Sequence, residues 1–235
     1  MSTATIGFIG GGNMAASIIG GLLASGVDAT RVRAGDPSQD SLDRLAALGP
    51  ITTSQDNLDI IPGCDVLVMA VNPQLMKTVC AGISEAVQRS KPLIISIAAG
   101  VTSDSLNQWL GGELAIVRCM PNTPALLRCG ATGLFANAVV SDEQRAQAQQ
   151  ILDAVGTALW VAQERELDAV TAVSGSGPAY FFLMMEAMQA SGEALGLSPD
   201  VARQLSQQTA LGAARMALES DVDVAELRRR VTSPK

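Results

Sequence analysis

The sequence is poor in residues that handle protons and in charge. Its 235 residues include no histidine, three lysines and one tyrosine, and only 17% are charged. Aromatic residues make up 3%, whereas 48% of the chain is hydrophobic, so a sizeable aliphatic core fits in one large domain or two smaller ones. The net charge of −7, with no basic stripe except Arg228–Arg230, argues against nucleic-acid binding.

Targeting and metal-binding patterns are also missing. None of the four cysteines forms a Cys-x-x-Cys pair, so we expect no zinc knuckle, no dithiol motif and no bound metal. The apolar N-terminus has no Lys or Arg before Arg31, which argues against a signal peptide. The run AYFFLMMEAM is too short to span a bilayer. We therefore expect a cytoplasmic protein with no membrane partner.

Short apolar runs alternate with helical patterns through the first two thirds of the chain. The runs are near-continuous aliphatic segments, as in strands buried on both faces of a parallel sheet. The alternation predicts βαβ units and an α/β, doubly wound sheet. Strands are expected at 5–9, 31–35, 65–71, 92–98, 114–120 and 132–136, and helices at 73–87, 103–110 and 141–155, the last with Gly156 just beyond its end.

The pattern changes near Ala162, and no strand is predicted from Glu164 onward. Two helices are expected there, each opened by a serine cap and a proline in its first turn. The first begins at Ser176 and Pro178, and the second at Ser198 and Pro199. We therefore divide the chain into a dinucleotide-binding α/β domain, residues 1–163, and a helical domain, residues 164–235.

The segment IGFIGGGNMA places three glycines between a predicted strand and a predicted helix. Gly10, Gly12 and Ala15 form the G-x-G-x-x-A pattern in the strand–turn–helix context that dinucleotide binding requires. Gly10 would make the tight turn, Gly12 would let the backbone approach a pyrophosphate, and Ala15 would let the helix pack closely. The N–H groups of the helix start would then meet the phosphates. A tight turn without a ligand is the alternative.

Asp36 lies at the end of the second predicted strand, about twenty residues beyond the glycine turn. A carboxylate there accepts the ribose 2′-hydroxyl and repels a 2′-phosphate, which favours NADH. Ser38 and Arg33 leave NADPH open. Alternatively, Asp36 only starts a turn with Pro37.

The scarcity of proton-handling residues bears on the reaction. A nicotinamide enzyme that oxidises an alcohol needs a proton acceptor, usually His, Lys or Tyr, and no lysine lies within 164–234. Reduction of a C=N bond depends less on an acid or base side chain, because an iminium carbon is already electrophilic and hydride placement carries most of the catalysis. The composition favours an imine substrate protonated from solvent. Tyr180 is expected to pack with Phe181 and Phe182 in an interdomain core.

Two further segments carry polar groups at helix or strand ends. VSGSGPAY is expected to form a small-residue loop that opens a helix, with free N–H groups at Ser176 and Gly177 that would hold a carboxylate. An ordinary helix cap is the alternative. RCMPNTPALL follows a strand and so should lie at the carboxyl edge of the sheet, where Asn122 and Thr123 offer polar contacts. A rigid loop is the alternative there.

Together these segments resemble the pyrroline-5-carboxylate reductase family. IGFIGGGNMA, SIAAGV, RCMPNTPA, DAVTAVSGSGPAYFF and ELRRRVTSP follow its pattern in order and spacing along essentially the whole chain. The resemblance implies an N-terminal Rossmann domain and a C-terminal helical dimerisation domain. It also implies reduction of 1-pyrroline-5-carboxylate to L-proline with NADPH or NADH, the last step of proline biosynthesis, by a homodimer or higher homo-oligomer.

The resemblance also assigns site residues. The pyrophosphate would lie at Ile9, Gly10, Gly11, Gly12, Asn13 and Met14, and the adenosine side at Asp36 and Asn57. The cofactor would be bordered by Ala70, Val71, Asn72, Pro73 and Ala98. The substrate side would be Glu164, Ser174, Gly175, Ser176, Gly177 and Pro178, with no residue assigned as the certain catalytic group.

The sequence departs from the family pattern in two places. Asn72 stands where the family usually has lysine, so a positive contact near the cofactor is lost. The family continues after TSP with a Gly-Gly-Thr-Thr-like segment and further helices, so the helical domain is expected to be truncated and the chain to reduce substrate poorly. A non-catalytic dinucleotide-binding protein is therefore one alternative. A β-hydroxyacid dehydrogenase is another, although it would need a lysine between Lys91 and Lys235, where none exists.

Overall fold

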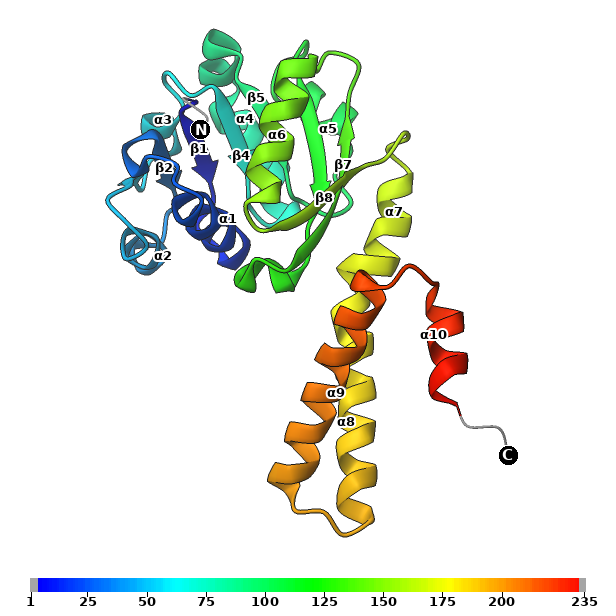
Figure 1. Ribbon diagram of the computed structural model, residues 1–235. Coiled ribbons are helices and arrows are strands. Elements are labelled where there is room, and N and C mark those ends of the chain that lie inside the picture. The colour runs from blue at the N-terminus through cyan, green and yellow to red at the C-terminus, as the bar shows by residue number, and fades with distance from the viewer. Residues whose placement is uncertain (1–3, 233–235) are drawn as a thin grey trace. The chain divides into compact units, whose positions relative to one another are not determined.

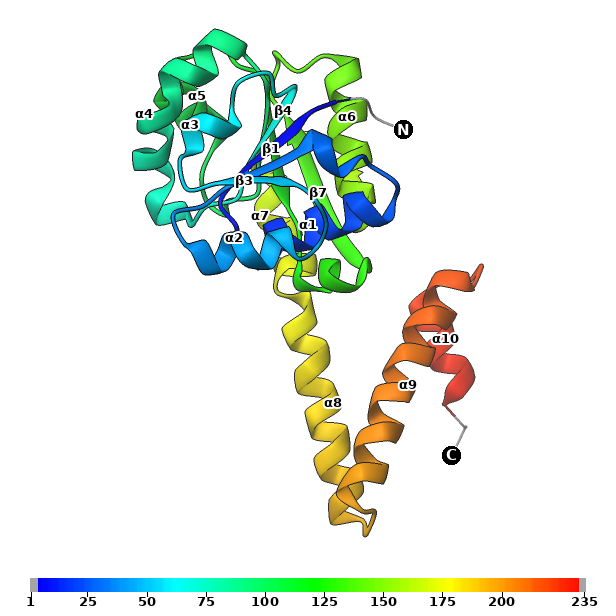
Figure 2. The same cartoon turned by 90° about the vertical axis from the view of Figure 1, so that its left-hand side faces the viewer.

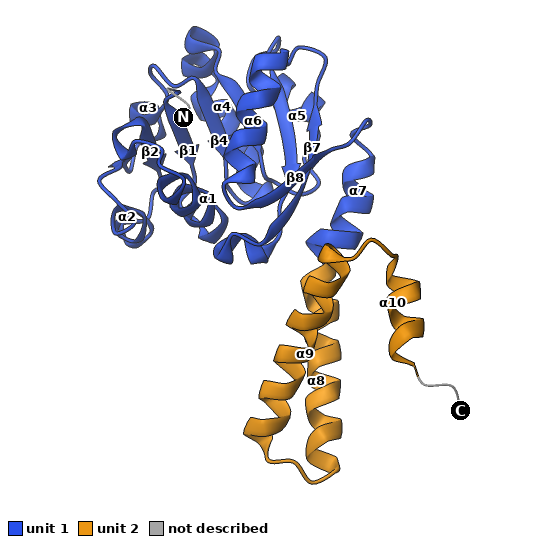
Figure 3. Cartoon of the chain, viewed as in Figure 1, with its two compact units in different colours: residues 1–176 blue, residues 177–235 orange. Residues whose placement is uncertain are grey.

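The computed structural model describes residues 4–232. The chain divides into two compact units, residues 1–176 and 177–235 (Figure 3). This division falls later than the change of sequence pattern at Glu164, because α7 (Glu166–Val170) packs against the strands β6 and β7 of the first unit. Residues 164–176 are therefore part of the first compact unit.

The first unit is built on one eight-stranded sheet, in the order β3-β2-β1-β4-β5-β6-β7-β8 (Figures 1 and 2). All neighbouring pairs are parallel except β6 and β7, so β7 and β8 run opposite to the other strands. The six predicted strands are confirmed. The strands are β1 (Ile6–Ile9), β2 (Val32–Gly35), β3 (Thr52–Ser54), β4 (Val66–Met69), β5 (Leu93–Ser96), β6 (Ile116–Met120), β7 (Gly130–Ala136) and β8 (Gly156–Trp160).

Helices cover both faces of this sheet (Figures 1 and 2). One hydrophobic cluster joins α1 (Asn13–Ala24) and α6 (Asp142–Asp153) to the sheet, and a second joins α4 (Pro73–Ser90) and α5 (Ser103–Trp109) to its other face. This is the doubly wound arrangement that the alternation predicts. The shorter helices are η1 (Ala29–Arg31), α2 (Gln39–Ala46), α3 (Asn57–Ile60) and η2 (Thr123–Leu127).

The start of α6 confirms the predicted cap. The Ser141 hydroxyl accepts the N–H of Gln144, and the Gln144 side chain accepts the N–H of Ser141, which is a complete capping box. Gly156 lies beyond the helix, as expected, and opens β8. With φ of 151° and a Cβ position that would overlap the Gly130 carbonyl oxygen, it is a position where only glycine fits.

The predicted loop at Ser174–Gly177 is wrong, because this segment is helical. After α7, the π-helix η3 spans Thr171–Gly175, Ser176 keeps right-handed helical backbone angles, and α8 spans Gly177–Ala194. The N–H of Ser176 donates to the Thr171 carbonyl at 2.8 Å. Ser176 is therefore not a helix N-cap, and its N–H is not free for a carboxylate.

The second unit consists of α8, α9 (Pro199–Glu219) and α10 (Val224–Val231). As predicted, Ser198 caps α9, since its hydroxyl accepts the N–H of Val201. The prediction that Tyr180 is buried with Phe181 and Phe182 is wrong for the chain by itself, since the three side chains are 59%, 65% and 61% exposed. The helix α8 lacks the one-sided apolar stripe of a helix packed on a single core.

Within residues 4–232, no helix is long and apolar enough to cross a membrane, and no cluster of three acidic or cysteine side chains could hold a metal ion. The four cysteines are free thiols, three of them buried. Burial raises the pKa of Cys64 and of Cys80 to about 11, so neither is a thiolate at neutral pH.

Candidate active site

The predicted cofactor residues gather at one edge of the sheet. They follow β1, β2, β3, β4 and β5, whose carboxyl ends all lie at that edge because these strands are parallel. Backbone hydrogen bonds continue past the strand ends, from the N–H of Gly10 to Gly35 and from the N–H of Ala70 to Ile9. The strand order reverses between β1 and β4, the position at which sheets of this type bind ligands.

The glycine turn has the geometry that its sequence predicts. Gly10 has φ of 103°, and a Cβ there would lie 2.6 Å from the Ala70 carbonyl oxygen, so only glycine fits. Gly12 is the N-cap of α1, is exposed, and has open space where a Cβ would stand. Gly12 supplies no side-chain acceptor to the first turn of α1, so the N–H groups at the start of this helix can bind an anionic group.

Asp36 holds this turn in place. One carboxylate oxygen accepts the N–H of Gly11 at 2.7 Å, and the other accepts the N–H of Ser38 at 2.8 Å. Asp36 therefore starts a turn after β2 and also fastens the glycine turn to it. The carboxylate remains half-exposed, with lone pairs left for a further donor.

Other residues of the same edge also suit a bound dinucleotide. Asn57, the first residue of α3, has a buried side-chain oxygen with no donor among the described residues, and it lies against Gly35. An orphaned buried acceptor of this kind fits a ligand N–H or O–H. Asn72 caps α4 by accepting the N–H of Gln74, which gives this residue a structural role. Pro73 occupies the first turn of α4, and Ala98 is buried beyond β5.

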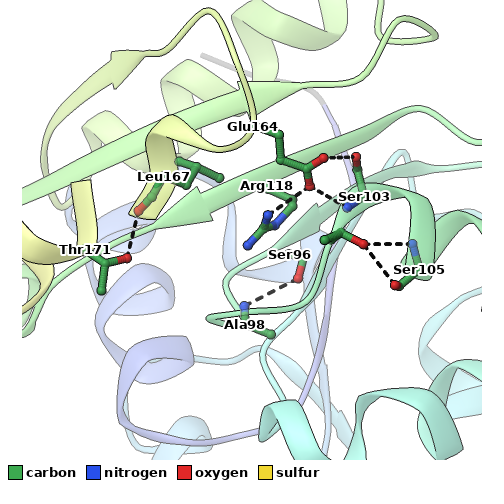
Figure 4. Close-up of polar contacts among 9 residues, drawn as sticks. Ser96, Ala98, Ser103, Ser105, Arg118, Glu164, Leu167 and Thr171 are labelled. Atoms are coloured by element: carbon green, nitrogen blue, oxygen red, sulfur yellow. Dashed lines mark hydrogen bonds and ion pairs between the residues drawn. The ribbon is translucent and has the colours of Figure 1, made fainter. Parts of the chain in front are cut away.

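A polar cluster surrounds Glu164, a predicted substrate residue, which contacts side chains of α5 and β6 (Figure 4). Its carboxylate accepts the N–H and hydroxyl of Ser103, at 2.6 and 2.9 Å, and pairs with the Arg118 guanidinium at 2.9 Å. Burial by itself raises the pKa of Glu164, but the Ser103 N–H, the Arg118 guanidinium and the Ser103 hydroxyl together hold this pKa below its ordinary value of 4.5. Glu164 is therefore an anion at neutral pH.

Ser103 and Arg118 are site residues that sequence reasoning missed. Arg118 lies within the buried strand β6 and is 8% exposed. A charged residue inside the apolar run LAIVRCM was a usable signal, because a buried guanidinium requires a partner. Ala98 appears in the same view, five residues before Ser103, so the β5–α5 loop joins the cofactor edge to this cluster (Figure 4).

The remaining predicted substrate residues lie in and after the π-helix. The Ser174 hydroxyl donates to the Val170 carbonyl, and the Ser174 carbonyl accepts from the side-chain amide of Asn122 at 3.0 Å. The structure thus joins the PNTP and SGSG segments. Gly177 and Pro178 belong to the second unit.

The strand order, the glycine turn and the open N-terminus of α1 define a Rossmann-type dinucleotide-binding protein with a helical second unit. A family model described as "Pyrroline-5-carboxylate reductase dimerisation" matches residues 164–235, and one described as "NADP oxidoreductase coenzyme F420-dependent" matches residues 5–100. A pyrroline-5-carboxylate reductase from Pseudomonas aeruginosa is 57% identical over 234 residues, which is 100% of this chain and 85% of that protein. The chain belongs to the pyrroline-5-carboxylate reductase family.

Solved structures agree with this assignment. A pyrroline-5-carboxylate reductase from Coxiella burnetii has a TM-score of 0.94 and 47% identity, covering 99% of this chain and 86% of that one. The Plasmodium falciparum enzyme with NADP bound has a TM-score of 0.87 and 28% identity, covering 100% of this chain and 86% of that one. A 3-hydroxyisobutyrate dehydrogenase from Mycobacterium tuberculosis, with a TM-score of 0.58 and 18% identity over 84% of this chain and 67% of its own, shares the fold alone.

Proposed function

We propose that this chain catalyses its family's reaction, the NAD(P)H-dependent reduction of 1-pyrroline-5-carboxylate to L-proline, the last step of proline biosynthesis. The family membership supports the reaction, and the glycine turn is the structural observation that supports use of a dinucleotide. Gly10 is restricted to glycine, Gly12 leaves open space at the start of α1, and both follow β1 at the point where the strand order reverses. NADPH and NADH are both candidate cofactors. The relative with NADP bound supports NADPH, and the Asp36 carboxylate supports NADH.

The proposed cofactor site uses the groups assembled at the sheet edge. Backbone N–H groups of residues 10–14 bind the pyrophosphate, with Ile9 as the last strand residue beneath it. Asp36 and Asn57 lie on the adenosine side, and residues 70–73 with Ala98 border the rest of the dinucleotide. Bound NAD(P)H supplies the hydride for the imine carbon.

The proposed substrate side consists of Glu164 and residues 174–178. Since the N–H of Ser176 is already bonded within the helix, we assign the substrate carboxylate to the exposed Ser176 hydroxyl rather than to that N–H. Glu164 holds Ser103 and Arg118 in place, and its carboxylate is already engaged by both. The imine nitrogen takes its proton from solvent, because the chain has no histidine and residues 164–234 contain no lysine.

We further propose that the chain is a homodimer or higher homo-oligomer through residues 164–235, and that it works in the cytoplasm, where its free thiols stay reduced. An unusual share of the large apolar side chains of the second unit is exposed, which is typical of an interface. These side chains include Tyr180, Phe181, Phe182, Leu183, Met184, Met188, Val201, Leu205, Leu211, Met216 and Leu218. Light scattering on the purified chain tests this; a monomer at micromolar concentration would contradict it.

A steady-state assay tests the proposed reaction. The chain should oxidise NADPH or NADH in the presence of 1-pyrroline-5-carboxylate, with hyperbolic dependence on both. A β-hydroxyacid offered with NAD(P)⁺ serves as the control and should give no turnover. Activity with the hydroxyacid but not with the imine would reject the proposal in favour of a dehydrogenase.

A further inference from the structure

The proline at position 178 creates a gap in the hydrogen bonding of the preceding helix. In an α-helix, the carbonyl of residue i accepts the N–H of residue i+4, so the Ser174 carbonyl would accept from residue 178. Proline has no N–H, and its ring crowds the carbonyl four residues before it. Pro178 therefore cannot donate to the Ser174 carbonyl, and a donor from another segment can take its place. The π-helix at Thr171–Gly175 lies directly before this position.

Asn122 supplies that donor. Its side-chain nitrogen donates to the Ser174 carbonyl at 3.0 Å, and its side-chain oxygen accepts the N–H of Ala131 at 2.9 Å. Asn122 is 8% exposed, so both bonds are largely shielded from water. The Asn122 amide thus joins the π-helix to the start of β7, because it bonds the Ser174 carbonyl and the Ala131 N–H.

We propose that Asn122 is a positioning residue for the substrate segment: it replaces the hydrogen bond that Pro178 removes, and so fixes the π-helix that leads into Ser174 and Ser176. The role of residues 174–176 in substrate binding rests on the proposed function. The hydrogen bond from Asn122 to the Ser174 carbonyl does not depend on it. Asn122 acts through Ser174 and needs no contact with the substrate.

Asn122→Asp tests this role with little change of shape. It keeps an acceptor for the N–H of Ala131, but places an oxygen opposite the Ser174 carbonyl oxygen. The KM for 1-pyrroline-5-carboxylate should rise about tenfold, while kcat changes less than about threefold, because one buried hydrogen bond that positions substrate is lost. The Kd for NADPH, measured by its fluorescence, should stay within about twofold, since the glycine turn is untouched.

Asn137→Asp is the matched control. The Asn137 side chain also accepts one backbone N–H, that of Ile116, and donates to one backbone carbonyl, that of Leu114, both at the amino-terminal end of β6. This substitution removes an equivalent donor at the opposite edge of the sheet. It should lower stability like Asn122→Asp but leave the KM for the imine unchanged. An equal rise in KM in both variants would overturn the proposal.

Pro178→Ala provides the rescue, because it restores a backbone N–H that can donate to the Ser174 carbonyl. In the Pro178→Ala background, Asn122→Asp should raise KM less than about threefold, and the difference between the two backgrounds measures the coupling. An effect of Asn122→Asp that is the same in both backgrounds would show that the missing proline N–H is not the reason for the contact.

Hydrogen exchange separates a failure of this inference from a failure of the proposed function. The Ser176 amide, which donates to Thr171 across the π-helix, should exchange at least about tenfold faster in Asn122→Asp, recover with Pro178→Ala, and stay slow in Asn137→Asp. If the parent chain reduces no imine, the proposed function fails, and this exchange measurement alone decides the positioning role. Unchanged exchange in Asn122→Asp would refute it.

Discussion

Gly12→Val perturbs the proposed cofactor site with little disturbance to the fold. Gly12 has φ of −71° and ψ of −178°, which valine adopts without strain, and a Cβ there meets no atom within 4 Å. The added side chain therefore costs stability only through the weaker N-cap, about 1 kcal/mol. It would stand where the pyrophosphate approaches the N–H groups of α1.

The expected loss follows from those N–H groups. Displacement of the pyrophosphate breaks at least one hydrogen bond to a charged group, which is worth about 1.5–3 kcal/mol, or roughly ten- to a hundredfold in the Kd for NADPH. Titration by NADPH fluorescence measures this, with a thermal melt to confirm folding. Gly20→Val is the control, since Gly20 lies in the same helix and also has open space at its Cβ position. Unchanged affinity in folded Gly12→Val, or an equal loss in Gly20→Val, would refute the assignment of the turn.

Three further predictions concern single side chains. Asp36→Ser should raise the NADPH-to-NADH affinity ratio about fivefold by removing a like charge from the 2′-phosphate, and Asp36→Asn should do the same; a flat ratio would leave Asp36 only its turn role. Glu164→Gln should destabilise the chain by about 2 kcal/mol at neutral pH, since Arg118 loses its anion. Because the pKa of Glu164 is lowered in the folded state, the difference in free energy of unfolding between the two chains should be complete above pH about 5. It should shrink as the pH falls below about 4.5 and Glu164 becomes protonated. Denaturant titrations measure it, and a difference that stays constant down to pH 3 would contradict the prediction. Tyr180→Phe should keep turnover within about threefold, because no side-chain acid is needed; a thousandfold loss with cofactor binding intact would show that one is.

Much of the first unit could be predicted because local patterns agree with its tertiary structure. Strands buried on both faces give continuous aliphatic runs, and the glycine turn and the Ser141 capping box have signatures within a few residues. The two strands that were missed, β3 and β8, are the edge strands. Thr52–Ser54 is three residues long, and Gly156–Trp160 is only partly buried, so neither gives a continuous apolar run.

The errors at Ser176 and Tyr180 have different physical causes. A serine before a proline is typical of a helix start, but the helix already begins at Glu166 and continues through the π-helix, because Asn122 compensates for the missing N–H. The apolar run after Ser176 predicts burial, and in the chain by itself these side chains remain exposed. Sequence periodicity indicates that a helix face is apolar, but not which surface covers it.

Contacts between distant segments could not be predicted. Glu164 meets Ser103 across 61 residues and Arg118 across 46, and Asn122 meets Ser174 across 52. Such pairs depend on the strand order, in which β5, β6 and β7 are neighbours. The sequence marks these residues as polar, but only the fold brings them together.

The most direct test of the central claim is to follow the hydride itself. The chain is incubated with 1-pyrroline-5-carboxylate and NADPH or NADH that carries deuterium at the transferred position of the nicotinamide, and the product is analysed by chiral chromatography and mass spectrometry. The account predicts L-proline with one deuterium on Cδ for each cofactor oxidised. Cofactor bound without oxidation, or oxidised without labelled L-proline, would contradict it.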